Sequence, residues 1–497
     1  MLPKKLATLL ATTALAATPA LAQDATLPAD PMPGETMTSE TTTSETMTGE
    51  TMTGEAMTGA AAAGSPMDDQ AIGKTFEVLP EDLPKPYATE AVRNPAVVVD
   101  RDGRKPIVPE GFEVTLFAEG LGPRQMLVRD NGDVIVAEQY QNELVLLRDD
   151  DGDGEAEIVS HFAQGFDEPY GLAMNGDGHL LVADVRGIWR VPTGEGEVRA
   201  SGSEIFAATP ASETPESERR PQTPMDHFPL TEQGVFGEAT GHTTRSLWRD
   251  PQTGELTVGV GSAGNISIEP PMRASIQRFD ADGTNQRTIV EGVRNPIGLD
   301  AHPETGELWM TVQERDGLGD GLVPDFMAPV EDGADYGFPH AYIGSNPQPE
   351  FAERDPSRVE ASMTPPVLFE AHSAAMYFTF YDGDSFPQEY HGDALVPLKG
   401  SWNRSDPTGY KVVRVHFEDG RPTGTYENFV TGFWVSGEER AEVWGRPADV
   451  DVMPDGSVLI ADDTGGTIWR VTYSGEPGGD AGEDDDRIDD DGNEDEN

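Results

Sequence analysis

The sequence contains no cysteine among its 497 residues. Without thiols the chain cannot form disulfides, thiolate metal sites, iron–sulfur clusters or a covalently attached haem. Basic residues are scarce as well: 34 lysines and arginines face 90 acidic residues, for a net charge of −56. Phosphate contacts need a basic surface, so neither a nucleic acid nor an anionic membrane is expected as a partner. We instead expect a solvated acidic surface suited to a salty habitat.

Long apolar runs are also missing after the first residues, so no membrane span is expected. At the start of the chain, Lys4 and Lys5 precede an apolar run, and Ala20-Leu21-Ala22 forms a small-x-small cleavage site. This pattern predicts a secretory signal peptide over residues 1–22. The mature protein is therefore expected to be soluble and either periplasmic or secreted.

Both ends of the mature chain have low sequence complexity. Residues 23–75 repeat near-copies of TMTGE, and residues 474–497 are rich in glycine and acidic residues. Such segments have too few apolar groups to offset the entropy of ordering, so we predict disorder in both. The folded domain is expected to span residues 76–473.

The expected folded part shows no convincing amphipathic helix. Instead, apolar strands joined by Asn-Gly, Asp-Gly or TGE turns, the signature of hairpins, recur six times, at residues 122–140, 168–191, 241–262, 294–314, 376–398 and 446–471. Six such units predict an all-β fold, a six-bladed β-propeller. Residues 112–121 would supply the outer strand of the last blade, and insertions near 200–240 and 317–373 would be loops.

Polar residues at equivalent ends of these repeats form the candidate site, because turns from successive blades converge at one end of a propeller's channel. His242, Arg294, Asn295 and Arg446 lie in turns that open repeats, and Lys399 ends a strand of the fifth repeat. A cluster of arginine, lysine and histidine side chains is typical of an anion-binding site. The alternative is that the arginines form surface ion pairs and that His242 is only a polar residue beside a strand.

Other polar motifs are weaker. His340 and His372 lie in less regular loops than His242. In DDDGDG, Asp149, Asp151 and Asp153 occupy positions 1, 3 and 5 of an EF-hand-like loop, but position 12 is Ser160 instead of glutamate and no helix flanks the loop. We interpret this segment as a structural hairpin tip that either binds calcium weakly or binds nothing.

Longer segments carry a resemblance to a known family, among them GHTTRSL, VRNPIGLDAHPETGELWMTVQERDGLGD, LVPLKGSWNR and WGRPADVDVMPDGSVLIADDTGGTIWRV. From about residue 108 to 473 the chain resembles the soluble glucose/sorbosone dehydrogenases, which use pyrroloquinoline quinone (PQQ), and in particular their sorbosone-dehydrogenase-like branch. The resemblance implies a six-bladed propeller that oxidises a sugar, an aldose or a sugar-derived aldehyde.

The resemblance also implies roles for individual residues. His242 corresponds to the catalytic base, and a calcium ion would act as a Lewis acid, bound through the backbone carbonyls of Gly317 and Leu318. The residues that correspond to cofactor contacts are Arg294, Asn295, Lys399, Arg446 and Asp463.

Two positions depart from the family pattern. Gly241 stands where glucose enzymes often have aspartate, and Ala448 stands where a second arginine is expected. Both departures bear on cofactor affinity and on the substrate. Since a cysteine-free chain cannot carry a cytochrome domain, electrons would pass to a separate acceptor. Two other functions are compatible with the repeats: a lactonase-type hydrolase with a calcium ion held by Glu, Asn and Asp, and a non-catalytic binding propeller.

Overall fold

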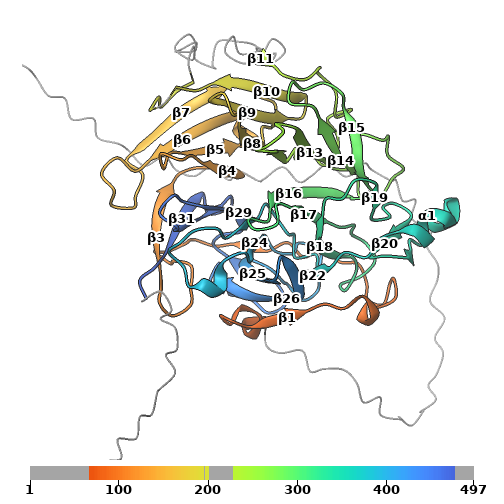
Figure 1. Cartoon of the computed structure of the whole chain (residues 1–497). Helices are drawn as coiled ribbons and strands as arrows, with labels where there is room; N and C mark the ends of the chain where they lie inside the picture. Colours follow the sequence, from red (N-terminus) through yellow and green to blue (C-terminus); the bar gives the residue numbers. More distant parts are fainter. Residues whose placement is uncertain (1–65, 195, 201–227, 476–497) are drawn as a thin grey trace, which may run out of the picture. The chain divides into compact units, whose positions relative to one another are not determined.

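The computed structural model describes residues 66–194, 196–200 and 228–475 (Figure 1). The chain divides into two units: residues 1–60, which lie outside the described ranges, and residues 61–497, which contain all of them. The predicted signal peptide, most of the predicted linker and the tail from residue 476 therefore lie outside the described residues. Within those ranges no helix is long and apolar enough to cross a membrane.

Strands are the main regular secondary structure of the described chain, with long loops and a few short helices between them (Figure 1). Its strands form eight sheets, of which six have at least four strands in the described ranges. The helices are η1 (Pro66–Gln70), η2 (Pro80–Asp82), η3 (Gln139–Gln141), η6 (Ala352–Arg354), α1 (Pro356–Ala361) and η7 (Gln388–Tyr390).

The first three larger sheets follow the first three predicted repeats. The first sheet contains β4 (Gln125–Val128), β5 (Val134–Glu138), β6 (Glu143–Arg148) and β7 (Ile158–Gln164). The second contains β8 (Gly171–Met174), β9 (His179–Asp184), β10 (Gly187–Pro192) and β11 (Phe228–Pro229). The third contains β12 (Leu247–Arg249), β13 (Leu256–Val260), β14 (Ser275–Phe279), β15 (Arg287–Glu291) and β19 (Ala334–Asp335).

The other three larger sheets follow the last three repeats. The fourth contains β16 (Asn295–Ala301), β17 (Leu308–Gln313), β18 (Pro324–Pro329) and β22 (Val367–Ala371). The fifth contains β23 (Thr379–Phe380), β24 (Ala394–Leu398), β25 (Lys411–Glu418), β26 (Arg421–Val430) and β1 (Thr75–Glu77). The sixth contains β29 (Pro447–Val452), β30 (Val458–Asp462), β31 (Thr467–Tyr473) and β3 (Phe112–Glu119).

Two small sheets complete the described strands. One consists of β2 (Val97–Val98), β28 (Glu442–Val443) and β27 (Trp434–Ser436), and the other of β20 (Ala341–Tyr342) and β21 (Asn346–Pro347).

The first strands of the six larger sheets contact one another in order, and the last of them, β29, also contacts β4 of the first sheet. Half-buried carboxylates connect neighbouring first strands. The Asp451 carboxylate accepts the backbone N–H of Val128 at 2.8 Å, and the Asp300 carboxylate accepts that of Phe380 at 2.8 Å. Each carboxylate accepts from a backbone N–H of the neighbouring sheet, so these polar groups keep a hydrogen-bond partner where the two first strands meet.

The sixth sheet confirms one prediction, since β3 from the start of the domain pairs antiparallel with β31 near its end. The prediction that residues 317–373 form only a loop is wrong. This segment contains β18 and β22, which pair with each other as the outer strands of the fourth sheet. Both strands are largely buried, but no short turn joins them, so they lack the hairpin signature.

Residues 66–75, which the sequence assigns to the disordered linker, are part of the folded unit. They contain η1 and lead into β1, which pairs with β26 and forms the edge of the fifth sheet. The reason is a buried ion pair: the ammonium of Lys411, whose side chain is 0% exposed, donates to the Asp69 carboxylate at 3.0 Å. Asn428 adds a hydrogen bond to the Asp69 carbonyl at 2.7 Å. These contacts anchor the segment to the fifth sheet.

Candidate functional site

His242 lies in the turn that precedes β12, with its ring held by one neighbour. Its Nδ1 is 3.0 Å from both the carbonyl oxygen and the hydroxyl of Ser262. A carbonyl only accepts, so Nδ1 carries the proton and Nε2 keeps its lone pair. Burial and then the Arg294 guanidinium lower the pKa of His242 to about 3. The imidazole is therefore neutral near pH 7, with an unprotonated Nε2.

Gly241 has a structural reason to be glycine. Its φ is +66°, in the left-handed region, and a Cβ at this position would lie 2.3 Å from the carbonyl carbon and oxygen of Ala263. An aspartate could not occupy this position unless the backbone moved. The departure from the glucose-enzyme pattern therefore follows from the local path of the chain beside Ser262.

Arg294 and Asn295 lie beside His242 at the start of β16. Arg294 is 5% exposed and donates to both the backbone and side-chain oxygens of Asn265, at 2.9 and 3.1 Å. Asn295 donates to Gln313, whereas its Oδ1 is buried and accepts no hydrogen bond within the described chain. A Cβ on Gly261 would lie 2.6 Å from both Asn295 Oδ1 and His242 Cβ. His242, Arg294 and Asn295 thus form one cluster, the histidine group.

A second cluster gathers three cations around one carboxylate. Lys399 Nζ donates to Asp463 Oδ2, and Arg124 Nη1 donates to the same oxygen at 2.5 Å. Arg446 lies against the Lys399 turn, with Nε donating to the Lys399 carbonyl at 3.0 Å and Nη2 to the Gly400 carbonyl at 2.7 Å. We call Arg124, Lys399, Arg446 and Asp463 the cation group.

The charges of this group depend strongly on one another. Burial raises the pKa of Asp463, but Lys399 and Arg124 outweigh it and hold that pKa well below its usual range. Burial and then Arg124 lower the pKa of Lys399 to about 7, against the opposite effect of Asp463. One carboxylate does not neutralise three cations, so this arrangement suits an added anion.

Sequence reasoning missed Arg124. It stands in the turn that opens the first repeat, as Arg294 opens the fourth and Arg446 the sixth. Applying the same positional rule to GPRQM would have found it.

Apolar residues that are close in sequence to both groups form a buried cluster, which we call the apolar floor. Tyr170, Ile297, Met376 and Ala448 form one buried cluster. Ile297 follows Asn295 by two residues, and Ala448 follows Arg446 by two. The guanidinium of Arg124 lies 5.9 Å from the centre of the Tyr170 ring. Ala448 is 0% exposed, so the residue that replaces the expected second arginine is part of the apolar floor.

The predicted calcium position does not offer a complete set of ligands. Calcium takes six to eight oxygens. The Leu318 carbonyl already accepts the N–H of Tyr87 at 2.8 Å, and the neighbouring Asp316 carboxylate accepts from Asn403 at 2.6 Å. The described residues bring no group of three acidic or histidine side chains together around Gly317 and Leu318. The chain's own donors therefore do not fit calcium here without further ligands.

His372, a weak candidate on sequence, lies beside this loop. It is buried, and its Nε2 is 3.0 Å from the Gly319 carbonyl while Nδ1 is 3.5 Å from the Asp316 carboxylate. Although burial lowers it, the Asp316 carboxylate and the Gly319 carbonyl raise the pKa of His372 overall. The loop is thus flanked by a buried histidine and not by an acidic cluster.

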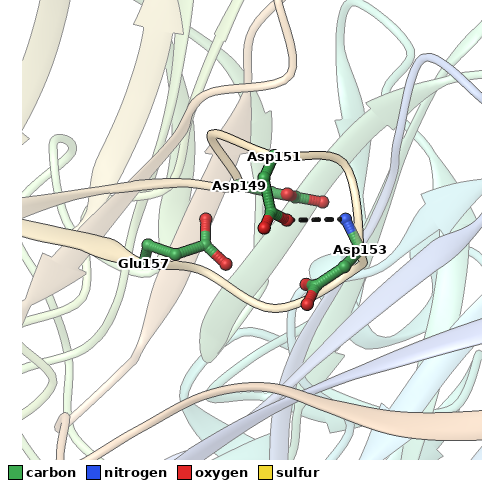
Figure 2. A group of neighbouring side chains, drawn as sticks. All are labelled: Asp149, Asp151, Asp153 and Glu157. Carbon is green, nitrogen blue, oxygen red and sulfur yellow. Dashed lines mark hydrogen bonds between the residues drawn. The ribbon is translucent and has the colours of Figure 1, made fainter.

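The DDDGDG segment forms the tip between β6 and β7 (Figure 2). Ligand atoms of Asp149, Asp151, Asp153 and Glu157 all lie within 4.8 Å of one another. The fourth acidic group of this cluster is Glu157, whereas Ser160 stands at position 12 of the loop. Repulsion from Asp153 and then Glu157 raises the pKa of the exposed Asp151. This geometry fits a tip that binds calcium weakly as well as one that binds nothing.

Comparisons with known proteins support the fold. A protein-family profile described as TrAA12-like matches residues 342–474. An uncharacterized protein of Borreliella burgdorferi is 32% identical over 236 residues, which is 47% of this chain and 61% of that protein. The chain therefore matches less than two thirds of the length of this relative.

Solved structures match over most of the chain. The iodide structure of the family AA12 carbohydrate-active enzyme of Trichoderma reesei is 18% identical, with a TM-score of 0.59, and the match covers 77% of this chain and 99% of that one. The holo form of the pyranose dehydrogenase PQQ domain of Coprinopsis cinerea is 18% identical, with a TM-score of 0.60 and coverage of 75% and 98%. The apo-form soluble aldose sugar dehydrogenase of Escherichia coli is 15% identical, with a TM-score of 0.51 and coverage of 73% and 99%. At these identities the likeness shows a shared fold.

Proposed function

We propose that this protein is a PQQ-dependent oxidoreductase that oxidises a sugar, either an aldose or a sugar-derived aldehyde such as sorbosone. The observation that carries the proposal is the cation group sharing one floor with a neutral His242. Three cations around a single carboxylate are unusual in a chain with a net charge of −56. The fold shared with proteins named pyranose dehydrogenase PQQ domain and aldose sugar dehydrogenase supports the same function.

The residues present fit the cofactor. PQQ carries three carboxylates, for which Arg124, Lys399 and Arg446 would provide charge-assisted hydrogen bonds. The buried Oδ1 of Asn295, which lacks a partner in the described chain, would accept from a donor of the cofactor or substrate. When bound, PQQ supplies an acceptor for the hydride that leaves the substrate carbon.

His242 would serve as the general base. Its Nε2 takes the proton of a substrate hydroxyl, or of the hydroxyl of an aldehyde hydrate, while the C–H bond breaks and the C=O bond forms. The Ser262 contacts hold the ring in the tautomer that leaves Nε2 free. An anion bound beside Arg294 would offset that guanidinium and raise the pKa of His242 toward the working pH.

We also propose that the six larger sheets are blades of a six-bladed propeller, supported by the ordered contacts of their first strands. The start of the sequence supports a periplasmic or secreted protein. Electrons would leave to a separate acceptor, because no cysteine is present to attach a haem. We assign no step to calcium, since the donors around Gly317 and Leu318 do not complete a calcium set.

Reconstitution tests the proposal. The purified protein is mixed with PQQ, with and without calcium, and supplied with glucose, other aldoses and sorbosone together with an electron-acceptor dye. We expect saturable PQQ binding and PQQ-dependent dye reduction with at least one of these substrates. His242→Ala should keep PQQ affinity and lose activity by about 10²- to 10⁴-fold. His161→Ala, whose side chain is 67% exposed, is the matched control.

Three results would overturn the proposal: no PQQ binding, PQQ binding without turnover of any substrate, or a His242→Ala variant as active as the wild type. Activity that is lost in EDTA and restored by calcium would contradict our conclusion that the residues around Gly317 and Leu318 do not complete a calcium site.

A further inference from the structure

Two buried arginines hold the backbone of the turn that carries His242. Arg273, immediately before the β14 region, is 4% exposed. Its Nε donates to the Gly261 carbonyl at 2.6 Å, Nη1 to the Glu238 carbonyl at 2.5 Å and Nη2 to the Thr240 carbonyl at 2.6 Å. One guanidinium thus ties the 238–242 turn to the end of β13.

Arg245 contacts the same turn through one of its nitrogens. It is 0% exposed, and its Nη1 donates to the carbonyl oxygens of His242 and Thr244 at 2.9 and 2.8 Å. Arg273 Nη2 also reaches the His242 carbonyl, at 3.4 Å. Two guanidinium groups therefore donate hydrogen bonds to the backbone carbonyl of His242, while the Ser262 carbonyl accepts from its ring.

Neither arginine has a carboxylate within ion-pair distance among the described residues, although acidic side chains outnumber basic ones in this chain by far. Burying a guanidinium without a carboxylate is costly unless hydrogen bonds compensate for the lost hydration. Arg278, on β14, shows the ordinary alternative: it lies nearer the surface and pairs with Asp332 at 3.3 Å. Two buried arginines donate to carbonyl oxygens of one turn, which indicates that they fix the backbone conformation of the turn that carries His242.

We propose that Arg273, assisted by Arg245, is a positioning residue that fixes the His242 turn so that Nδ1 stays on Ser262 and Nε2 faces the substrate. This inference rests on the proposed role of His242 as the base. Arg273 acts through the backbone, with its guanidinium bound to carbonyls and not to reacting atoms.

The charges that act on His242 make this testable. Arg294 and Arg273 disfavour its protonation, Asp316 favours it, and the Ser262 carbonyl accepts from Nδ1. Arg273→Gln removes one of these cations together with the backbone ties, so His242 should titrate at a higher pH. Arg273→Lys keeps the charge but loses the three-way fork, because an ammonium cannot match that planar geometry. In the lysine variant we expect the titration of His242 to change little and the backbone of the 238–242 turn to be less firmly fixed.

The experiment combines nitrogen NMR of labelled histidines with steady-state kinetics. Comparison with His242→Gln assigns the His242 signals, which then report its tautomer and titration without cofactor or substrate. We expect kcat to fall by about 10- to 100-fold in both Arg273 variants while KM changes little, as for a misplaced catalytic group. Arg278→Lys is the matched control and should behave as the wild type. Arg245→Lys should show a smaller loss of kcat.

The outcomes separate this inference from the proposed function. If Arg273→Lys keeps both wild-type kcat and the Nδ1–H tautomer, Arg273 does not position His242. If Arg273→Gln does not fold, the lysine variant carries the test. If His242→Ala is fully active, the role of His242 is wrong, whereas the NMR signals still report whether Arg273 holds the ring.

Discussion

Replacing Gly241 by alanine should both destabilise the protein and impair the site. A non-glycine residue in the left-handed region costs about 1–2 kcal/mol, and forcing an atom into a filled position costs about 1–3 kcal/mol. Here a Cβ would lie 2.3 Å from the Ala263 carbonyl, so both costs apply. We expect Gly241→Ala to lower the free energy of unfolding by about 2–5 kcal/mol. Since Ala263 follows Ser262, the same displacement would move the acceptor of His242 Nδ1.

Two glycines separate the contributions. Gly132 has a φ of +84°, but a Cβ added there would meet nothing within 4 Å, so Gly132→Ala measures the conformational cost alone. Gly264 has open space and no positive φ, so Gly264→Ala should change stability by less than about 1 kcal/mol. Urea unfolding of the three variants gives the free energies. Substrate turnover gives the functional effect, which should reach about 100-fold for Gly241→Ala only. If Gly241→Ala costs no more than Gly132→Ala, the argument from the Ala263 contact is refuted.

Three further predictions concern charged groups. Asp69→Asn should cost about 3–5 kcal/mol in urea unfolding, because it leaves the Lys411 ammonium buried without its carboxylate, and adding Lys411→Met should recover part of that loss. Because the pKa of Lys399 is lowered to about 7, PQQ affinity should fall as the pH rises through 7, and calorimetry in two buffers should detect proton uptake on binding. The unfolded chain binds this proton up to about pH 10, so Lys399 contributes a gain in stability as pH rises from about 7 to 10. Arg124→Gln should weaken PQQ binding at least about tenfold, whereas an equal affinity would exclude Arg124 from the anion site.

Much of the fold could be predicted because its signal is local. Each of the six repeats contains an apolar strand, a tight turn and a second apolar strand, and each corresponds to paired strands in the structure. The pairing of β3 with β31 was predictable from the missing outer strand of the last repeat. In contrast, β18 and β22 could not be recognised, because they pair across a long excursion with no turn signature between them. The inclusion of residues 66–75 depends on a long-range ion pair between Asp69 and Lys411, which a local pattern does not reveal.

The candidate site divides in the same way. His242, Arg294 and Asn295 were predictable as neighbours from their equivalent positions in successive repeats, and so were Lys399 and Arg446. What the sequence could not reveal is how each is held. Side-chain directions decide that Arg273 donates to carbonyl oxygens of the His242 turn. They also decide that Lys399 and Arg124 donate to the same oxygen of Asp463. In the sequence Gly241 was a departure that bears on cofactor affinity and substrate, whereas its φ and the position of Ala263 make glycine a requirement of the turn.

The pairing of β3 with β31 has a consequence for how the chain is made. Among the strands of the larger sheets in the described residues, β3 is synthesised first after β1, but its partner β31 emerges last. Until then β3 is an open edge whose backbone groups can pair with any other strand. Closing this contact must wait for the five other sheets, which favours slow folding and exposes the nascent chain to misassociation. A truncation that removes β31 would leave that edge open permanently, so aggregation is the expected fate of chains that end early.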